Sequence, residues 1–334
     1  MRRTPLTLST LALAACLTLA GCGQDAEPDA AASTPAAPPT AVDCSTVTVD
    51  SDAATLPTLS GADGEEPAVS WGGGQAPENL TVKTLTEGSG AQIGSDDVIV
   101  ANYVGWEWDS SQAFDTSWGR GAPASFSLKA VIPGWTCGLA GTHVGDRVLL
   151  SIPAELAYGE KQPTPSAAAE QLPQQGQPSG DLVFVVDVLG GGSPEEISAG
   201  TKDAVVEGEA ALAERGVSVS GSLGEAATIT VNEGAAEPTE PEVIVLARGS
   251  GAPLEAGSKV LAHTAGAPWA GGQAGQPFST WDQDSPQVLV LDDQPPLDKL
   301  AGVPAGSRVV ILMPKDETTG TPASAFVMDI EQVL

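Results

Sequence analysis

Apolar residues along the chain gather in short runs that Gly, Pro or Asp residues interrupt. Four of these runs are rich in Val, Leu, Ile and Thr and have the length of β-strands. They are residues 80–85, 98–104, 147–152 and 182–189. The last run is apolar except for Asp187, which predicts a central strand buried on both faces. Residues 131–139 allow a helix that Gly134 keeps short, so the pattern predicts an antiparallel sheet wrapped on one short helix.

The same pattern occurs twice. The sequence Gly-Ser-Gly-Ala at 88–91 recurs at 249–252, an offset of 161 residues. At the same offset, Leu-Ala-Gly at 139–141 recurs at 300–302. Because these matches keep their order and spacing, we expect two copies of one domain, joined by a linker helix over 201–215. The predicted fold class is α+β, mainly β, with two half-barrel domains.

The N-terminus has the layout of an export signal. Arg2 and Arg3 precede an apolar run over 6–20 that is too short to span a bilayer. The run ends in Leu-Ala-Gly followed by Cys22, which resembles the lipobox of bacterial lipoproteins, whose cysteine is acylated. An ordinary signal peptide containing a cysteine is the alternative. An acylated Cys22 would anchor the chain to the outer side of the cell membrane.

These observations give an expected division of the whole chain. The expected parts are a signal peptide (1–21), a disordered tether (22–43), an N-terminal extension (44–77), the first domain (78–192), a linker (193–219) and the second domain (220–334). The tether lacks apolar periodicity, which is typical of a spacer.

Composition excludes several function classes. The chain of 334 residues has 14 Lys and Arg against 43 Asp and Glu, a net charge of −29, which repels the phosphates of nucleic acids. The chain has two His and four Cys, and no His pair stands at the spacing of metal ligands, so we expect neither a metal site nor a cofactor. Once Cys16 is cleaved off and Cys22 is acylated, an exported chain retains Cys44 and Cys137, which predicts one disulfide bond.

The first copy resembles the FKBP-type peptidyl-prolyl cis–trans isomerases over about residues 78–190. Five segments in family order carry the resemblance. They are 98–105, Phe114-Asp115, Val-Ile-Pro-Gly-Trp at 131–135, Ala-Tyr-Gly at 157–159 and Leu-Val-Phe at 182–184. The resemblance implies an antiparallel half-barrel around a short helix. It also implies catalysis of Xaa–Pro isomerisation without a cofactor.

The resemblance also implies a role for each site residue. Trp135 would form the floor of an apolar pocket for the proline ring, and Tyr158 would lie at its rim. Asp115 would face the pocket and pair with Tyr103 and Arg120. The pocket walls would be Tyr103, Phe114, Val131, Ile132 and Phe184.

Two departures from the family pattern concern the substrate. A wall position that is aromatic in many members holds Ala124, which predicts a more open pocket. The segment 160–181 is long and polar, with Leu172 as its one large apolar candidate for substrate contact. The barrier to rotation about an Xaa–Pro bond, about 18–20 kcal/mol, arises from the double-bond character of C–N. Such a pocket would lower this barrier by removing water from the amide.

The second copy is expected to lack the site. Thr264, Ser279, Pro296 and Thr319 stand opposite Tyr103, Asp115, Trp135 and Tyr158. Such a degenerate copy could bind unfolded chains, position the first copy or contact a partner.

The sequence thus predicts a monomeric, lipid-anchored isomerase acting on unfolded or newly exported proteins, without nucleic acid. The alternative is a non-catalytic, membrane-anchored chaperone or protein-binding module, since fold alone does not fix function.

Overall fold

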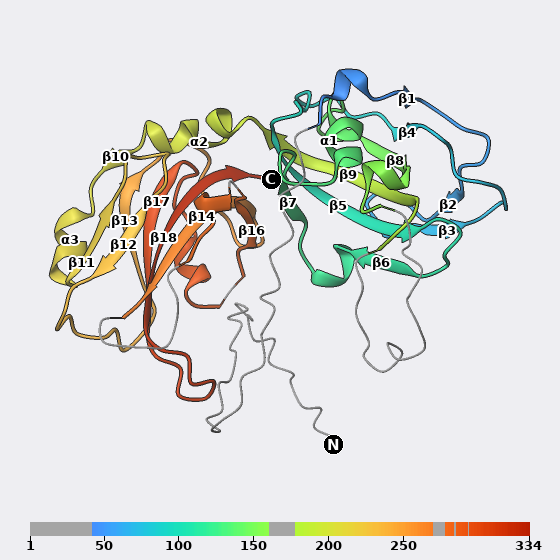
Figure 1. Cartoon of the computed structure of the whole chain (residues 1–334). Coiled ribbons are helices and arrows are strands. Elements are labelled where there is room, and N and C mark those ends of the chain that lie inside the picture. The colour runs from blue at the N-terminus through green and yellow to red at the C-terminus, as the bar shows by residue number, and fades with distance from the viewer. Residues whose placement is uncertain (1–41, 160–177, 270–277, 284, 293) are drawn as a thin grey trace, which may run out of the picture. The chain divides into compact units, whose positions relative to one another are not determined.

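The computed structural model describes residues 42–159, 178–269, 278–283, 285–292 and 294–334. These residues form two seven-stranded sheets and two separate β-hairpins (Figure 1). The signal segment 1–21, Cys22 and most of the expected tether lie outside the described residues, as does Leu172. None of the described helices is long and apolar enough to cross a membrane.

The first sheet has the strand order β1-β4-β8-β9-β5-β6, with β7 also paired to β5. Its strands are β1 (Val49–Asp50), β4 (Leu80–Thr86), β5 (Val98–Glu107), β6 (Ala113–Thr116), β7 (Ala124–Ser127), β8 (Arg147–Ile152) and β9 (Leu182–Gly192). Its helices are α1 (Pro133–Leu139) and the 3-10 turns η1 (Cys44–Thr46), η2 (Trp118–Arg120) and η3 (Ala154–Leu156). The four strands and the short helix that the pattern predicts are all present.

The second sheet has the order β10-β13-β17-β18-β14-β15, with β16 paired to β14. Its strands are β10 (Val205–Val206), β13 (Glu242–Arg248), β14 (Lys259–Pro268), β15 (Phe278–Ser279), β16 (Gln287–Val290), β17 (Ser307–Met313) and β18 (Ser324–Val333). The turns η4 (Trp281–Gln283) and η5 (Leu297–Leu300) follow the places of η2 and α1 in chain order. Strand by strand, the order repeats that of the first sheet.

The first sheet is packed on both faces. α1 lies against one face, here called the inner face, and closes a core that includes Ile99, Leu150 and Val186. A hairpin of β2 (Thr58–Ser60) and β3 (Ala68–Ser70) contributes Leu59 and Val69 to a cluster on the opposite, outer face. β9 is buried on both faces because apolar residues at odd and even positions meet these two cores.

A hairpin also covers the outer face of the second sheet. It is formed by β11 (Val217–Ser220) and β12 (Thr228–Val231), which share a core with Val310 and Val327. Both hairpins are held by an indole at matching positions, 161 residues apart. Trp108 Nε1 donates to the carbonyl of Gly74 and Trp269 Nε1 to that of Ala235, each at 3.0 Å.

Each hairpin is also held by an arginine of the sheet. Arg147 donates to the carbonyls of Ala62 and Glu65 in the first hairpin turn, at 2.9 and 2.7 Å. Arg308 donates in the same way to Gly221 and Glu225, at 3.1 and 2.9 Å. A buried guanidinium thus supplies the donors that these turn carbonyls require.

Two sequence-based boundaries are wrong. The boundary expected between 219 and 220 falls inside β11, and the linker assigned to 193–219 contains strands of the second fold. The single helix expected over 201–215 is instead two short helices, α2 (Pro194–Lys202) and α3 (Glu209–Glu214), separated by β10. α2 begins at Ser193 with a capping box to Glu196, a local signal at the helix start.

The two sheets differ at one edge. β1 pairs with β4 in parallel, through Val49 with Leu80. β10 pairs with β13 in antiparallel, through Val205 with Arg248. The added strand therefore pairs with the start of β4 in the first sheet and with the end of β13 in the second.

Candidate active site

Three aromatic rings surround Trp135 on the inner face of the first sheet. The ring centroids of Tyr103 on β5, Phe126 on β7 and Phe184 on β9 lie 5.4, 5.1 and 5.3 Å from that of Trp135. All three contacts are edge-to-face, the favourable geometry for aromatic pairs. We call these four residues the ring cage. Because Trp135 is only 4% exposed, its indole is fixed from several sides.

Phe126 is the member of the cage that sequence reasoning missed. Phe126, two residues beyond Ala124 on β7, lies against both Tyr103 and Trp135. The more open pocket expected at Ala124 stays a prediction. Residues two apart on a strand share a face. The alternation of Ala124, Phe126 and Leu128 was the available signal.

Two aromatic residues named by the resemblance, Phe114 and Tyr158, are open to solvent, and Phe114 packs on the cage. Phe114 on β6 is 36% exposed and packs edge-to-face on Phe184, with centroids 5.6 Å apart. Gly105 makes room for this contact, since a Cβ there would lie 2.6 Å from Phe184 and 2.7 Å from Phe114. Tyr158, which follows η3, is 45% exposed. A ligand approaching the cage would therefore meet aromatic surface first.

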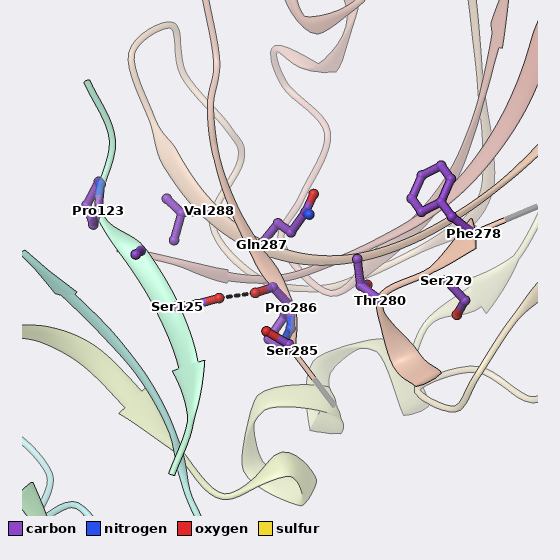
Figure 2. Close-up of a pocket in the computed structure, with 10 residues that line it drawn as sticks. Pro123, Ser125, Phe278, Ser279, Thr280, Ser285, Pro286, Gln287 and Val288 are labelled. Carbon is purple, nitrogen blue, oxygen red and sulfur yellow. Dashed lines mark hydrogen bonds between the residues drawn. The ribbon is translucent and has the colours of Figure 1, made fainter. Parts of the chain in front are cut away.

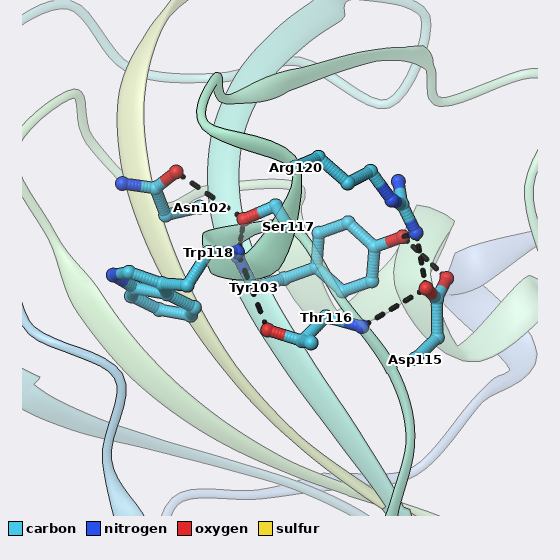
Figure 3. Close-up of polar contacts among 7 residues, drawn as sticks. All are labelled: Asn102, Tyr103, Asp115, Thr116, Ser117, Trp118 and Arg120. Carbon is cyan, nitrogen blue, oxygen red and sulfur yellow. Dashed lines mark hydrogen bonds and ion pairs between the residues drawn. The ribbon is translucent and has the colours of Figure 1, made fainter. Parts of the chain in front are cut away.

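Polar side chains meet at the hydroxyl of Tyr103, one member of the cage (Figure 3). The Tyr103 hydroxyl donates to Asp115 Oδ2 at 2.5 Å, and Arg120 Nη2 lies 3.0 Å from the same hydroxyl. Arg120 also pairs with Asp115 Oδ1. The backbone N–H of Thr116 donates to that oxygen at 2.9 Å. The structure thus brings together the Tyr–Asp–Arg set that the sequence predicted.

The electrostatics of this set keep it charged but unreactive. Burial works to raise the pKa of Asp115, but hydrogen bonds from Tyr103 and Arg120 outweigh it and hold that pKa below its ordinary value. Burial and the hydrogen bond to Asp115 raise the pKa of Tyr103 to about 12. Burial also raises the pKa of Tyr158, and the charge of Asp115 adds to this. At neutral pH Asp115 is therefore ionised and Tyr103 and Tyr158 are neutral, so none of these three side chains is suited to act as a general acid or base.

A row of hydrogen bonds behind Tyr103 fixes its backbone. The N–H of Tyr103 donates to Ser117 Oγ at 2.9 Å, and the N–H of Ser117 donates back to the Tyr103 carbonyl at 2.9 Å. Ser117 Oγ in turn donates to Asn102 Oδ1 at 3.2 Å (Figure 3). The phenol is therefore set by the sheet as well as by Asp115.

The remaining predicted residues have definite places. Val131 and Ile132 precede α1 and pack with the same core as the ring cage. Cys44 and Cys137 are joined by a disulfide bond, with Cα atoms 5.2 Å apart. Cys22 and Leu172 lie outside the described residues. Within the described ranges, no group of three or more His, Cys, Asp or Glu side chains could hold a metal ion.

The second sheet keeps part of this arrangement, so the expectation that its site is entirely lost is wrong. Phe278 and Phe326 lie 6.0 Å apart over Gly266, as Phe114 and Phe184 do over Gly105. The sheet register places Phe278 opposite Gly266, where Asp115 stands opposite Gly105. By strand pairing Phe278, and not Ser279, therefore takes the position of Asp115. Its ring nevertheless makes the contact that the ring of Phe114 makes in the first sheet, where a bulge beside Gly105 shifts the register by one residue.

The other members of the set are absent from the second sheet. Thr264 takes the place of Tyr103, and the turn η5, which contains no aromatic residue, follows Pro296 in place of α1. Ser279 instead matches Thr116, and Thr280 binds the backbone of Thr264 as Ser117 binds that of Tyr103. The second sheet therefore keeps the supports of the site without its floor.

A cavity outside the ring cage is drawn in Figure 2. It has a volume of about 480 Å³ and is lined by Phe278, Thr280 and Pro286 together with Pro123 and Ser125. The Ser125 hydroxyl donates to the carbonyl of Pro286 (Figure 2). No member of the cage lines this cavity.

Comparison with known proteins decides the family. A family model described as FKBP-type peptidyl-prolyl cis-trans isomerase matches residues 90–189, which include the whole ring cage. The FK506-binding protein of Streptomyces anulatus is 37% identical over 127 residues, covering 37% of this chain and 96% of the relative. The chain belongs to the FKBP-type peptidyl-prolyl cis-trans isomerases.

Two further similarities fall within this family. A probable FK506-binding protein of Corynebacterium glutamicum is 34% identical over 125 residues, covering 37% of this chain and 98% of the relative. The crystal structure of FkpA from Escherichia coli aligns with 36% identity and a TM-score of 0.29, covering 34% of this chain and 49% of that one.

Proposed function

We propose that the first sheet catalyses cis–trans isomerisation of Xaa–Pro bonds in newly exported chains, and that the ring cage is its active site. The observation that carries this is the position of Trp135. Its indole makes edge-to-face contacts with three rings, and Phe114, which packs on Phe184, is exposed beside the cage. A proline ring is apolar and fits an aromatic surface of this kind.

The proposed mechanism breaks no bond. A planar amide is more charge-separated than a twisted one, so water stabilises the planar ground state more strongly. Moving the amide from water to an apolar cage removes that preference and lowers the barrier of about 18–20 kcal/mol. Only interactions that favour the twisted state over the planar one contribute to the rate.

The Tyr–Asp–Arg set acts by position in this mechanism. Asp115 accepts three donors and stays ionised, so it fixes the Tyr103 ring against Trp135 without taking a proton. Arg120 lies over the Tyr103 ring, with Cζ 5.6 Å from its centroid, and adds a cation–π contact. The set thereby gives the cage one rigid wall.

The proposed setting is the outer side of a cell membrane. The lipobox-like segment ending in Cys22 supports export and a lipid anchor. Slow prolyl isomerisation limits the folding of many exported chains, which makes them suitable substrates. Incorporation of a labelled fatty acid into the wild-type chain, and its loss in Cys22→Ser, would test the anchor.

The experiment that tests the proposed activity compares two buried tryptophans in the full chain. We expect the wild type to accelerate both cis-to-trans relaxation of an Xaa–Pro peptide and a proline-limited refolding reaction. Trp135→Leu should lose about tenfold or more of kcat/KM, because the pocket floor is gone. Trp269→Leu removes an equally buried indole from the second sheet and should keep the activity.

Circular dichroism of each variant shows whether it is folded. A folded wild-type chain that accelerates neither reaction would overturn the proposed activity and leave the non-catalytic binding module. Equal losses in both variants would place the activity elsewhere than the ring cage.

A further inference from the structure

The helix that carries the cage floor has little stability of its own. α1 is seven residues long and contains Gly134 and Gly138, and its N-cap, Ile132, makes no side-chain capping bond. Helices this short are unstable in isolation, and glycine weakens them further. Gly134 packs so closely on β8 that a Cβ there would lie 2.3 Å from Ile152. Contacts with the rest of the fold therefore decide where α1, and with it Trp135, is placed.

A covalent contact of this kind reaches α1 from the N-terminal segment. Cys137, two residues after Trp135 and 7% exposed, is bonded to Cys44. Val42, Cys44 and Val47 pack on the core that contains the ring cage. The disulfide bond thus ties α1 to a segment that is itself docked on the first sheet.

The second sheet has no such connection. Residues 193–334 contain no cysteine, and the turn η5 stands where the first half has α1. The copy that lacks a tryptophan floor thus also lacks the cross-link. The disulfide bond is therefore found in the half that has the aromatic site, and the sheet topology common to both halves forms without it.

We propose that the Cys44–Cys137 disulfide bond positions Trp135 for isomerisation, so that reducing this bond lowers the activity of a chain that remains folded. The inference rests on the proposed isomerase function. A dithiol reductant would transfer two electrons and two protons to the bond, giving two protein thiols and a cyclic disulfide. α1 would then be held by packing alone.

Each cysteine of the bond lines a cavity. Cys137 lines a cavity of about 480 Å³ together with Val82 and His143. Cys44 lines another of about 300 Å³ that extends to Val131 and Pro133, four and two residues before Trp135. Both cavities are thus bordered by residues of α1, the helix that carries Trp135.

The test uses the full chain carrying Cys16→Ser and Cys22→Ser, so that the Cys44–Cys137 pair alone can react. Isomerase activity is measured with and without dithiothreitol, well below the unfolding temperature of the reduced chain. We expect reduction to lower kcat/KM about tenfold, because a misplacement of about 1 Å can cost about a hundredfold and packing would still hold α1. Adding Cys44→Ser and Cys137→Ser should give the same loss, and dithiothreitol should then have no further effect.

A spectroscopic signal separates positioning from stability, because a disulfide bond also stabilises a fold through its unfolded state. The indole N–H of Trp135 is buried beside three rings and has no hydrogen-bond partner among the described residues. Its proton resonance, assigned with Trp135→Phe, should move on reduction. That of Trp269, bonded to Ala235 in the second sheet, should not.

Each outcome decides between the two ideas. An oxidised, folded chain without activity overturns the proposed function and not the position of α1. An active oxidised chain that keeps its rate and its Trp135 resonance after reduction overturns the inference. Global unfolding on reduction also overturns it, because the bond would then act through stability alone.

Discussion

The two sheets agree on their outer faces and differ on their inner faces. The outer face of each has a row of polar residues in the same register, here called the outer row. In the first sheet Arg147 and Asn102 stand opposite Asp187, and Ser117 is hydrogen-bonded to Asn102. In the second sheet Arg308 and His263 stand opposite Asp329, and Thr280 is hydrogen-bonded to His263. These eight residues are the two outer rows. On the inner face, Phe278, Phe326 and Gly266 are all that the second sheet keeps of the aromatic arrangement.

This difference separates the demands of folding from those of the site. The arginine of each outer row binds the turn of a hairpin, which covers the outer core in both halves. Losing such a residue would uncover apolar surface and leave buried polar groups without partners. Folding does not require the floor and the polar wall of the ring cage in this way, because other apolar residues can fill the same core. The inner faces can therefore differ while the two folds stay alike.

The largest effect is expected when the outer row is broken. Asp329→Ala should lower the free energy of unfolding by about 3–5 kcal/mol, since it leaves the buried Arg308 without a counter-charge. Asp187→Ala should cost less, because Arg147 also lies 3.5 Å from the exposed carboxylate of Asp63. Urea unfolding of both variants measures the difference. Equal losses of unfolding free energy would mean that Asp63 does not compensate for the removal of Asp187.

An acid-sensitive position should distinguish the second sheet. Burial lowers the pKa of His263 to about 4, whereas the unfolded chain has the ordinary value of 6.5. The contribution of neutral His263 to the free energy of unfolding is therefore complete above pH 6.5. It is lost as the pH falls towards 4, which lowers that free energy by up to about 3 kcal/mol. The matching residue of the first sheet, Asn102, does not titrate.

The variant His263→Asn gives the second sheet the residue of the first and should reduce this acid sensitivity. The measurement is the urea midpoint of wild type and variant at pH 7.5 and at pH 4.5. His263 bonds Thr280 and stacks on Trp281, so the variant should be somewhat less stable at the higher pH. An unchanged pH dependence would mean that other groups account for it.

A matched pair of glycines tests whether the activity belongs to the first inner face. Gly105→Ala pushes a methyl group against Phe114 and Phe184, and Gly266→Ala does the same to Phe278 and Phe326. Overpacking of about 2 kcal/mol at the site would lower kcat/KM about thirtyfold. We expect this loss for Gly105→Ala, whereas Gly266→Ala should keep the wild-type rate. A loss of activity in Gly266→Ala would give the second inner face a part in catalysis.

The smallest effect is expected at the polar wall. Tyr103→Phe removes the hydrogen bond to Asp115 but keeps the ring against Trp135, so the activity should fall about fivefold at most, the equivalent of about 1 kcal/mol. The rate should also stay flat through the neutral pH range. A far larger loss would mean that the hydroxyl itself contacts the substrate.

Sequence periodicity predicted much of the first sheet, and the family resemblance named much of its site. The strands at 80–86, 98–107, 147–152 and 182–192 and the helix at 133–139 each contain or closely match a predicted run. The resemblance also named Tyr103, Asp115 and Arg120, which the structure brings together. The hairpin strands β2 and β3 were missed because three residues are too few to show a period.

The chain by itself determined the repeat, the alternation of its long strands and the family, because these depend on residue type and spacing alone. Only the tertiary structure decided that Phe126 belongs to the ring cage, that Phe278 and not Ser279 stands in the place of Asp115, and that the hairpins complete each half. These features depend on register, bulges and packing between segments far apart in sequence, for which residue spacing carries no signal.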